Sequence, residues 1–98
     1  MIYKYSLGVP YKKGQGYFQL SIPHAKVKKV LDIQIQDNSA VLWAEVEEDD
    51  FDNWLDIAVV WTGFQEPEML YYFKTIQEPA TGLVYHYYVH NPEEDYDL

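Results

Sequence analysis

Apolar and polar side chains alternate through residues 29–47, KVLDIQIQDNSAVLWAEVE, and this feature restricts the fold more than any other. Apolar residues at every second position are typical of a half-buried β-strand. The alternation is interrupted at Asp37-Asn38, two residues that tolerate the positive φ angles of a two-residue hairpin turn. The stretch therefore predicts a β-hairpin made of two strands and a tight turn.

The register of this hairpin follows from its side chains. With a two-residue turn, one face pairs Ile35 with Ala40, Ile33 with Leu42 and Leu31 with Ala44, and the other pairs Gln34 with Val41 and Asp32 with Trp43. A four-residue loop would keep the alternation but place Asp32 opposite Glu45, and like charges across a strand pair cost about 0.5 kcal/mol. We therefore expect the shorter loop, with Leu31, Ile33 and Ile35 pointing inward.

Five further segments have the composition of strands and are bounded by Pro, Gly, Asn or Asp: residues 2–7, 17–22, 54–63, 70–77 and 83–90. Residues 23–28 are expected to form a basic turn and residues 47–53 an acidic loop, with a short helical turn at residues 50–54 that Asp50 would cap. No segment of ten or more residues has a helical period with caps. The sequence predicts an all-β fold, a small antiparallel sandwich or partly open barrel of about seven short strands.

Composition limits the chain to one domain, because 98 residues are too few for two cores. We expect a single β domain at residues 1–91 and an acidic C-terminal tail at residues 92–98. The chain has no cysteine, which excludes disulfides and thiolate metal sites. No run approaches the ~20 apolar residues of a membrane span, and the start lacks a signal-peptide pattern. We expect a soluble intracellular protein that does not interact with membranes.

Charge is distributed unevenly along the chain, whose net charge is −9. Residues 1–31 contain six lysines and no acid, whereas residues 32–98 contain all sixteen acids and one lysine. There is no arginine, so bidentate contacts to phosphates or bases are unavailable. Nucleic acid repels an acidic chain, and we therefore expect no direct binding to DNA or RNA.

The order of several short motifs resembles a family of small uncharacterised proteins of tailed bacteriophages, known only as a domain of unknown function. These motifs are an IYKY start, a strand with a proline turn (Leu20, Pro23, Ala25), an ILxVQVQ-like strand at residues 30–36, LWAxV at 42–46, Thr62-Gly63, Thr-x-Gln at 75–77 and Gly-Leu-Val-aromatic-His at 82–86. The resemblance spans most of the chain, which departs from it by a longer basic turn at residues 26–29 and by its acidic loop and tail. It implies a phage origin and a small β fold, and it implies no activity.

Carboxylates cluster in residues 45–56 and again in residues 93–97. The interaction candidates among them are Glu47, Glu48, Asp49, Asp50 and Asp52. In one interpretation they imitate a phosphate backbone or dock on a basic host protein. In the other they are solvated loops that keep a small aromatic-rich protein in solution.

Trp43, Gln34 and Gln36 are predicted to share the hairpin face opposite the inward-pointing apolar residues. A tryptophan among amide side chains is typical of a partner-binding patch. The alternative, which we favour, is that the second sheet covers this face and Trp43 belongs to the core.

The lysines suggest a different ligand. Lys26, Lys28 and Lys29, together with Lys12 and Lys13, would contact the phosphates of a nucleotide while tyrosines stack on its base. The tyrosines of the last two strands also suit a subunit interface. In addition, the basic early part and the acidic late part would attract each other between copies, which predicts a homo-oligomer.

No pattern indicates catalysis or a metal site. His86 and His90 are four residues apart on one strand, about 13 Å, and cannot bind the same ion. The serines lack an elbow motif, there is no phosphate loop, and residues 49–53 lack the pattern of a calcium loop. We expect no enzyme activity, no catalytic residue, no cofactor and no metal.

The sequence thus predicts a small acidic phage accessory protein in the cytoplasm of an infected bacterium. It would act by binding a host protein through its acidic surface, in an anti-defence or nucleic-acid-mimic role. The alternatives are a nucleotide-sequestering protein and a structural or oligomeric phage component.

Overall fold

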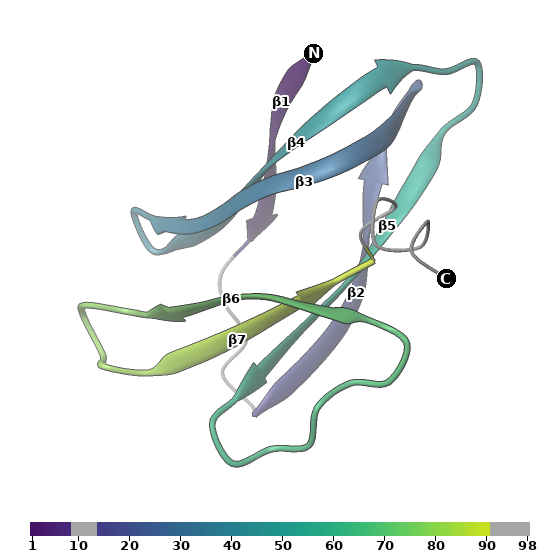
Figure 1. The fold of residues 1–98 in the computed structure, drawn as a ribbon. Coiled ribbons are helices and arrows are strands. Elements are labelled where there is room, and N and C mark those ends of the chain that lie inside the picture. The colour runs from purple at the N-terminus through teal and green to yellow at the C-terminus, as the bar shows by residue number, and fades with distance from the viewer. Residues whose placement is uncertain (9–13, 91–98) are drawn as a thin grey trace.

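The computed structural model describes residues 1–8 and 14–90, and these residues form seven antiparallel strands in two sheets (Figure 1). The strands are β1 (Ile2–Gly8), β2 (Gln15–Ile22), β3 (Ala25–Gln36), β4 (Ser39–Glu48), β5 (Asn53–Trp61), β6 (Tyr71–Gln77) and β7 (Val84–Val89). Sheet A has the order β1-β4-β3, and sheet B has the order β2-β5-β7-β6. The predicted all-β sandwich is confirmed, and no barrel closes. The predicted C-terminal tail lies outside the described residues.

The central hairpin has the predicted turn and most of the predicted register. Asp37 and Asn38 have φ angles of 48° and 67°, as a two-residue turn requires. Ile33 lies opposite Leu42 and Ile35 opposite Ala40. The sequence therefore determines this part of the fold through local turn chemistry and alternation.

The predicted inward position of Leu31 is wrong. A bulge between Val30 and Asp32 leaves Leu31 unpaired and places Val30 opposite Ala44. Val30 is consequently 2% exposed and Leu31 38% exposed. An extra residue in one strand reverses its alternation, and a second bulge after Val27 does the same. Residues 27–31 carry no clean alternation that would reveal either bulge.

Two predictions about the connections between strands are also wrong. The turn expected at residues 23–28 includes only Pro23 and His24, because β3 begins at Ala25. Lys26 and Lys28 therefore lie on an edge strand, where lysines are common. No helical turn forms at residues 50–54.

One continuous antiparallel ribbon passes from sheet B to sheet A at a corner. Its halves are β2 with β5 and β3 with β4, and the pairing continues from Ile22 opposite Asn53 to Ala25 opposite Glu48. Asn53 holds this corner, because its amide nitrogen donates to the Ala25 carbonyl at 2.8 Å and to the Asp49 carboxylate at 2.9 Å. Strands that switch sheet at such bends connect the layers of a sandwich.

The core lies between the two sheets. Sheet A contributes Val27, Val30, Ile33, Leu42, Ala44 and Val46, and sheet B contributes Ile22, Leu55, Ile57, Val59, Tyr85, Tyr87 and Val89. Tyr85 donates a hydrogen bond to the buried Glu78 carboxylate at 3.1 Å. The Tyr87 hydroxyl has no hydrogen-bond partner among the described residues, and burial raises its pKa.

We expect Asn53→Ala to lower the free energy of unfolding by about 1–3 kcal/mol, because it leaves the carbonyl of buried Ala25 without its amide donor. Urea unfolding should show a lower midpoint with an unchanged slope. Gln65→Ala removes an amide from an exposed loop and should change stability by less than about 0.5 kcal/mol. Equal midpoints for the two variants would contradict the role given to Asn53.

The two core tyrosines should respond oppositely to loss of the hydroxyl. Tyr85→Phe removes the donor to buried Glu78 and should destabilise by about 1–3 kcal/mol, whereas Tyr87→Phe removes an unpaired buried hydroxyl and should be neutral or stabilise by up to about 1 kcal/mol. Both variants keep the aromatic ring, so packing is matched. Thermal unfolding measures the difference, and a larger loss at Tyr87 would overturn this interpretation.

Candidate binding face on sheet B

Several of the predicted acidic candidates form contacts within the chain. The Glu47 carboxylate lies 3.8 Å from the ammonium groups of both Lys26 and Lys28. Asp52 accepts from the backbone N–H of His24 at 2.9 Å. The hydrogen bond from Asn53 lowers the pKa of Asp49. Glu47, Asp49 and Asp52 therefore contribute to the corner and its flanking strands.

The remaining two acidic candidates are Glu48, at the end of β4, and Asp50, in the corner loop. Both are exposed. Whether any of the five candidates contacts a partner stays a prediction.

Trp43, Gln34 and Gln36 lie together on the outer face of sheet A, as the alternation predicted. Trp43 is half-buried there beneath Lys4, whose ammonium is 5.6 Å from the ring centroid, so its predicted position in the core is wrong. Lys4 also donates to Gln36 at 3.2 Å, and Gln36 donates to Gln34 at 3.4 Å. The polar groups of these side chains thus form hydrogen bonds with one another.

This hydrogen-bonded row continues to the edge of the sandwich. Gln34 donates to Asp32 at 2.9 Å, and Lys74 of sheet B donates to Asp32 at 2.7 Å. Burial raises the pKa of Asp32, but the hydrogen bonds from Lys74 and Gln34 outweigh it and hold the pKa below its ordinary value. The row therefore ties β3 of one sheet to β6 of the other.

Three of the predicted phosphate-binding lysines are described, and each lies near or opposite an acidic side chain. Lys26 and Lys28 converge on the Glu47 carboxylate, and Lys29 lies opposite Glu45 in the strand register. Lys12 and Lys13 lie outside the described residues. Nucleotide binding by these lysines stays a prediction.

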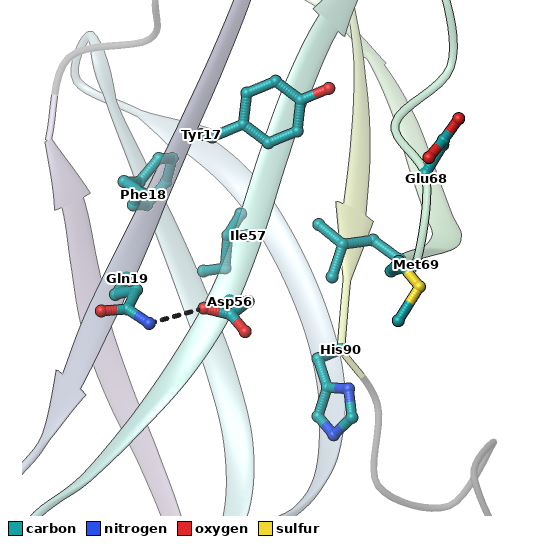
Figure 2. Close-up of a pocket in the computed structure, with 9 residues that line it drawn as sticks. Tyr17, Phe18, Gln19, Asp56, Ile57, Glu68, Met69 and His90 are labelled. Atoms are coloured by element: carbon teal, nitrogen blue, oxygen red, sulfur yellow. Dashed lines mark hydrogen bonds between the residues drawn. The ribbon is translucent and has the colours of Figure 1, made fainter.

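A cleft of about 440 Å³ opens on the outer face of sheet B (Figure 2). It is lined by Tyr17, Phe18 and Gln19 of β2, Asp56 and Ile57 of β5, His90 after β7, and Glu68, Met69 and Leu70 of the 62–70 segment. Its volume and its mixture of apolar and polar groups are typical of ligand sites. It brings together residues from four separate parts of the chain.

The 62–70 segment is fastened to the sheet beside this cleft. Leu70 packs against a small cluster of Ala58, Val60 and Tyr88, and the Tyr88 hydroxyl donates to Glu66 at 3.2 Å. Next to Leu70, Met69 has a φ of 68° and is 91% exposed. A positive φ at a bulky residue is strained, and such strain is concentrated at functional sites.

Two exposed aromatic side chains lie on the same face of the sheet as the cleft. Tyr17 is 53% exposed, and Trp54 is 61% exposed. Trp54 is two residues from Asp56 on β5, so both point to the outer face. We call Tyr17, Trp54, Asp56, Glu68 and Met69 the sheet B face.

Negative charge on the sheet B face has none of the described lysines beside it. Asp56 accepts from Gln19 at 2.9 Å, which orients its carboxylate, and Glu68 is exposed at the rim (Figure 2). The described lysines belong to sheet A, apart from Lys74, which bonds Asp32. The face therefore combines exposed apolar groups with carboxylates that no described lysine neutralises.

Sequence reasoning missed this face, although one signal was present. Leu55, Ile57 and Val59 occupy every second position of β5, and all three are buried. The same alternation assigns Trp54 and Asp56 to the other side. Nothing in the sequence indicates that Met69 lies beside them.

A second hollow of about 320 Å³ on sheet B contains a hydrogen-bond chain centred on His86. Its two ring nitrogens are each 2.9 Å from a hydroxyl, that of Thr62 and that of Thr75, and Thr75 is 2.7 Å from the Tyr72 hydroxyl. A threonine beside a histidine has the geometry of a nucleophile and its base. Here, however, the second nitrogen bonds a neutral hydroxyl, where the catalytic triad has a carboxylate. The hydrogen bonds link β6 and β7 to Thr62, the residue that follows β5.

Residues 1–8 and 14–90 contain no cluster of three or more His, Asp or Glu side chains able to hold a metal ion. No helix among them has the length and apolar character needed to cross a membrane.

Comparison with known proteins identifies a family. No curated protein and no solved structure matches the chain. The model of a family described as Domain of unknown function (DUF7352) matches residues 1–97. The resemblance to an uncharacterised domain family is thereby confirmed. Because the match covers nearly the whole sequence, the chain belongs to the DUF7352 family.

Proposed function

We propose that the protein is a non-catalytic binding protein, and that its partner is a protein with a basic surface that docks on the sheet B face. One observation carries this proposal: exposed Tyr17, Trp54 and Met69 adjoin the carboxylates of Asp56 and Glu68, with no described lysine beside them. Tyrosine, tryptophan and methionine are enriched at protein interfaces. The proposed acidic surface is thus the sheet B face, which differs from the candidates predicted from the sequence, Glu47, Glu48, Asp49, Asp50 and Asp52.

Burial of the exposed apolar side chains would contribute to the affinity of such docking. Full burial of a large apolar side chain contributes about 1.5–3 kcal/mol, so three anchors offset much of the ~4–15 kcal/mol that association costs. A binding hot spot usually has an aromatic side chain at its centre, surrounded by contacts that keep water away from it. Carboxylates on the face would speed encounter with a basic partner and make binding depend on salt.

The biological setting belongs to the same proposal. The resemblance to small proteins of tailed bacteriophages supports action in the cytoplasm of an infected bacterium, with a host protein as partner. Blocking a basic host surface, including one that otherwise binds nucleic acid, would suit an anti-defence role. The pairing of Lys26 and Lys28 with Glu47 makes the nucleotide-sequestering alternative less well supported.

We expect Asp56→Asn/Glu68→Gln to abolish capture of a specific host protein from bacterial lysate by the immobilised protein. We expect Trp54→Ala to weaken it about tenfold or more, because a hot-spot side chain contributes about 2 kcal/mol or more. Recovery from wild type should fall steeply between low and high salt. Mass spectrometry of the eluates and titration of the purified candidate measure these effects.

The matched control is Asp37→Asn/Glu45→Gln, which removes the same charge from sheet A. Equal loss of binding in both double variants, or salt-insensitive binding, would contradict the proposed face. Sedimentation at two ionic strengths separates host binding from self-association. A wild-type mass that rises at low salt, and no longer rises in Asp56→Asn/Glu68→Gln, would identify a second copy as the occupant.

A further inference from the structure

The four edge strands of the two sheets differ in how they are protected. Unpaired sheet edges invite further strands, and natural edges are blocked by lysines and bulges. β3 has three lysines and two bulges, β6 has a bulge beside Lys74, and β1 has Lys4 and a bulge after Ser6. β2 has none of these features: its eight residues pair with β5 without a register shift, and none of them is charged.

The backbone groups at the free edge of β2 can be identified from the register. The Trp61 N–H donates to the Gly14 carbonyl at 2.6 Å, so Gly14 faces β5, and bonding residues alternate in an antiparallel pair. Residues 16, 18, 20 and 22 therefore bond to β5. It follows that Gln15, Tyr17, Gln19 and Ser21 point their N–H and C=O groups away from it.

The other side of β5 supports the same assignment. The His90 N–H donates to the Asp56 carbonyl at 3.0 Å, which turns Asp56 toward β7 and its neighbours Leu55 and Ile57 toward β2. Among the described strands, none lies beyond β2 in sheet B. The edge thus presents four donors and four acceptors in regular spacing.

The side chains along this edge specify what an added strand would carry. On the outer face, Tyr17 and Gln19 adjoin the cleft with its carboxylates, which favours cationic side chains on that side. On the inner face, Phe18 and Leu20 are half-buried against the core, which favours apolar side chains. Because side chains alternate across a strand, the matching segment alternates lysine or arginine with apolar residues.

We propose that the partner contributes an extended segment of this alternating pattern, which pairs with the free edge of β2 as an additional strand of sheet B. Main-chain hydrogen bonds supply affinity in such strand addition, and alternate side chains supply specificity. The inference rests on the proposed function in one respect, since it takes the partner to be a basic protein. It adds the partner's conformation and the atoms that it contacts.

Two capped seven-residue peptides of identical composition test this inference, an alternating peptide KVKVKVK and a block peptide KKKKVVV. At peptide concentrations on the order of 1 mM, we expect the alternating peptide to bind about tenfold more tightly in NMR titrations. It should also slow hydrogen exchange at the amides of Gln15, Tyr17, Gln19 and Ser21. Equal binding of the two peptides, or binding without slower exchange at these amides, would overturn the proposal.

Methylation of alternate peptide amides gives a sharper test that leaves the protein unchanged. Only every second N–H of an added strand faces its neighbour. One of two peptides, methylated on the lysine amides or on the valine amides, should therefore lose binding while the other retains it. Equal effects of both methylation patterns would exclude strand addition.

Proline substitutions test the edge from the protein side. Ser21→Pro removes an edge N–H that makes no bond to β5, and should weaken the alternating peptide about tenfold. The control is Ile2→Pro on the edge of β1, where the Met1–Val46 backbone bonds imply that the Ile2 N–H also points outward. If Ser21→Pro fails to fold, the two methylated peptides decide the question. Equal affinities of both proline variants for the alternating peptide would overturn the proposal.

The double variant Asp56→Asn/Glu68→Gln separates this inference from the proposed function. One outcome is that the variant lowers the affinity for both peptides equally and that neither peptide slows amide exchange along β2 of the wild type. In that case the face binds basic partners without strand addition, so the inference fails while the proposed function stands. If the alternating peptide still slows exchange along β2 in this variant, the strand addition stands and the role given to the carboxylates fails.

Discussion

The passage of one antiparallel ribbon between two sheets is the constraint on which the rest of this structure depends. β2 and β5 continue into β3 and β4 across a corner, so the two layers are not separate units that pack afterwards. Asn53 joins the two halves of the ribbon by bonding the Ala25 carbonyl and the Asp49 carboxylate. A corner buried on its inner side needs such partners, because an unpaired backbone carbonyl there costs about 1–3 kcal/mol.

The structure of this corner gives the acidic loop a structural role. As a sequence, EEDDFDN offers a block of charge that suits either a docking surface or a solvated loop. In the structure, Asp49 and Asp52 accept hydrogen bonds that hold the bend, and Glu47 lies between two lysines of the neighbouring strand. The local pairing of opposite charges is concentrated here and along sheet A. The carboxylates of Asp56 and Glu68 on sheet B have no described lysine beside them, and this difference in charge supports the contact surface proposed on that face.

The sequence predicted the elements whose signals are local, and it could not predict those that depend on distant partners. The Asp37-Asn38 turn and most of the hairpin register follow from residue type and alternation, and both are found in the structure. Leu31 was misplaced because a bulge reverses the alternation of side chains along the strand. A bulge depends on how two strands pair, and the residue types of the segment Val-Lys-Lys-Val-Leu do not indicate one. Trp43 was misplaced because sheet B packs on the opposite face of sheet A, the face of Ile33 and Leu42.

The sheet B face could not be predicted from the sequence, because it too depends on contacts between distant parts of the chain. Tyr17, Asp56 and Met69 meet only because β2 pairs with β5 and the 62–70 segment returns across the sheet. The topology also explains why the cleft and the unprotected edge coincide. Among the described lysines other than Lys74, Lys4 lies on β1 and those of residues 26–29 lie on β3, both in sheet A, and β2 itself carries no charged residue. Within the described residues, the neutral edge strand and the nearby carboxylates without a lysine beside them therefore follow from the same distribution of charge. The proposed partner, a basic extended segment, fits both features.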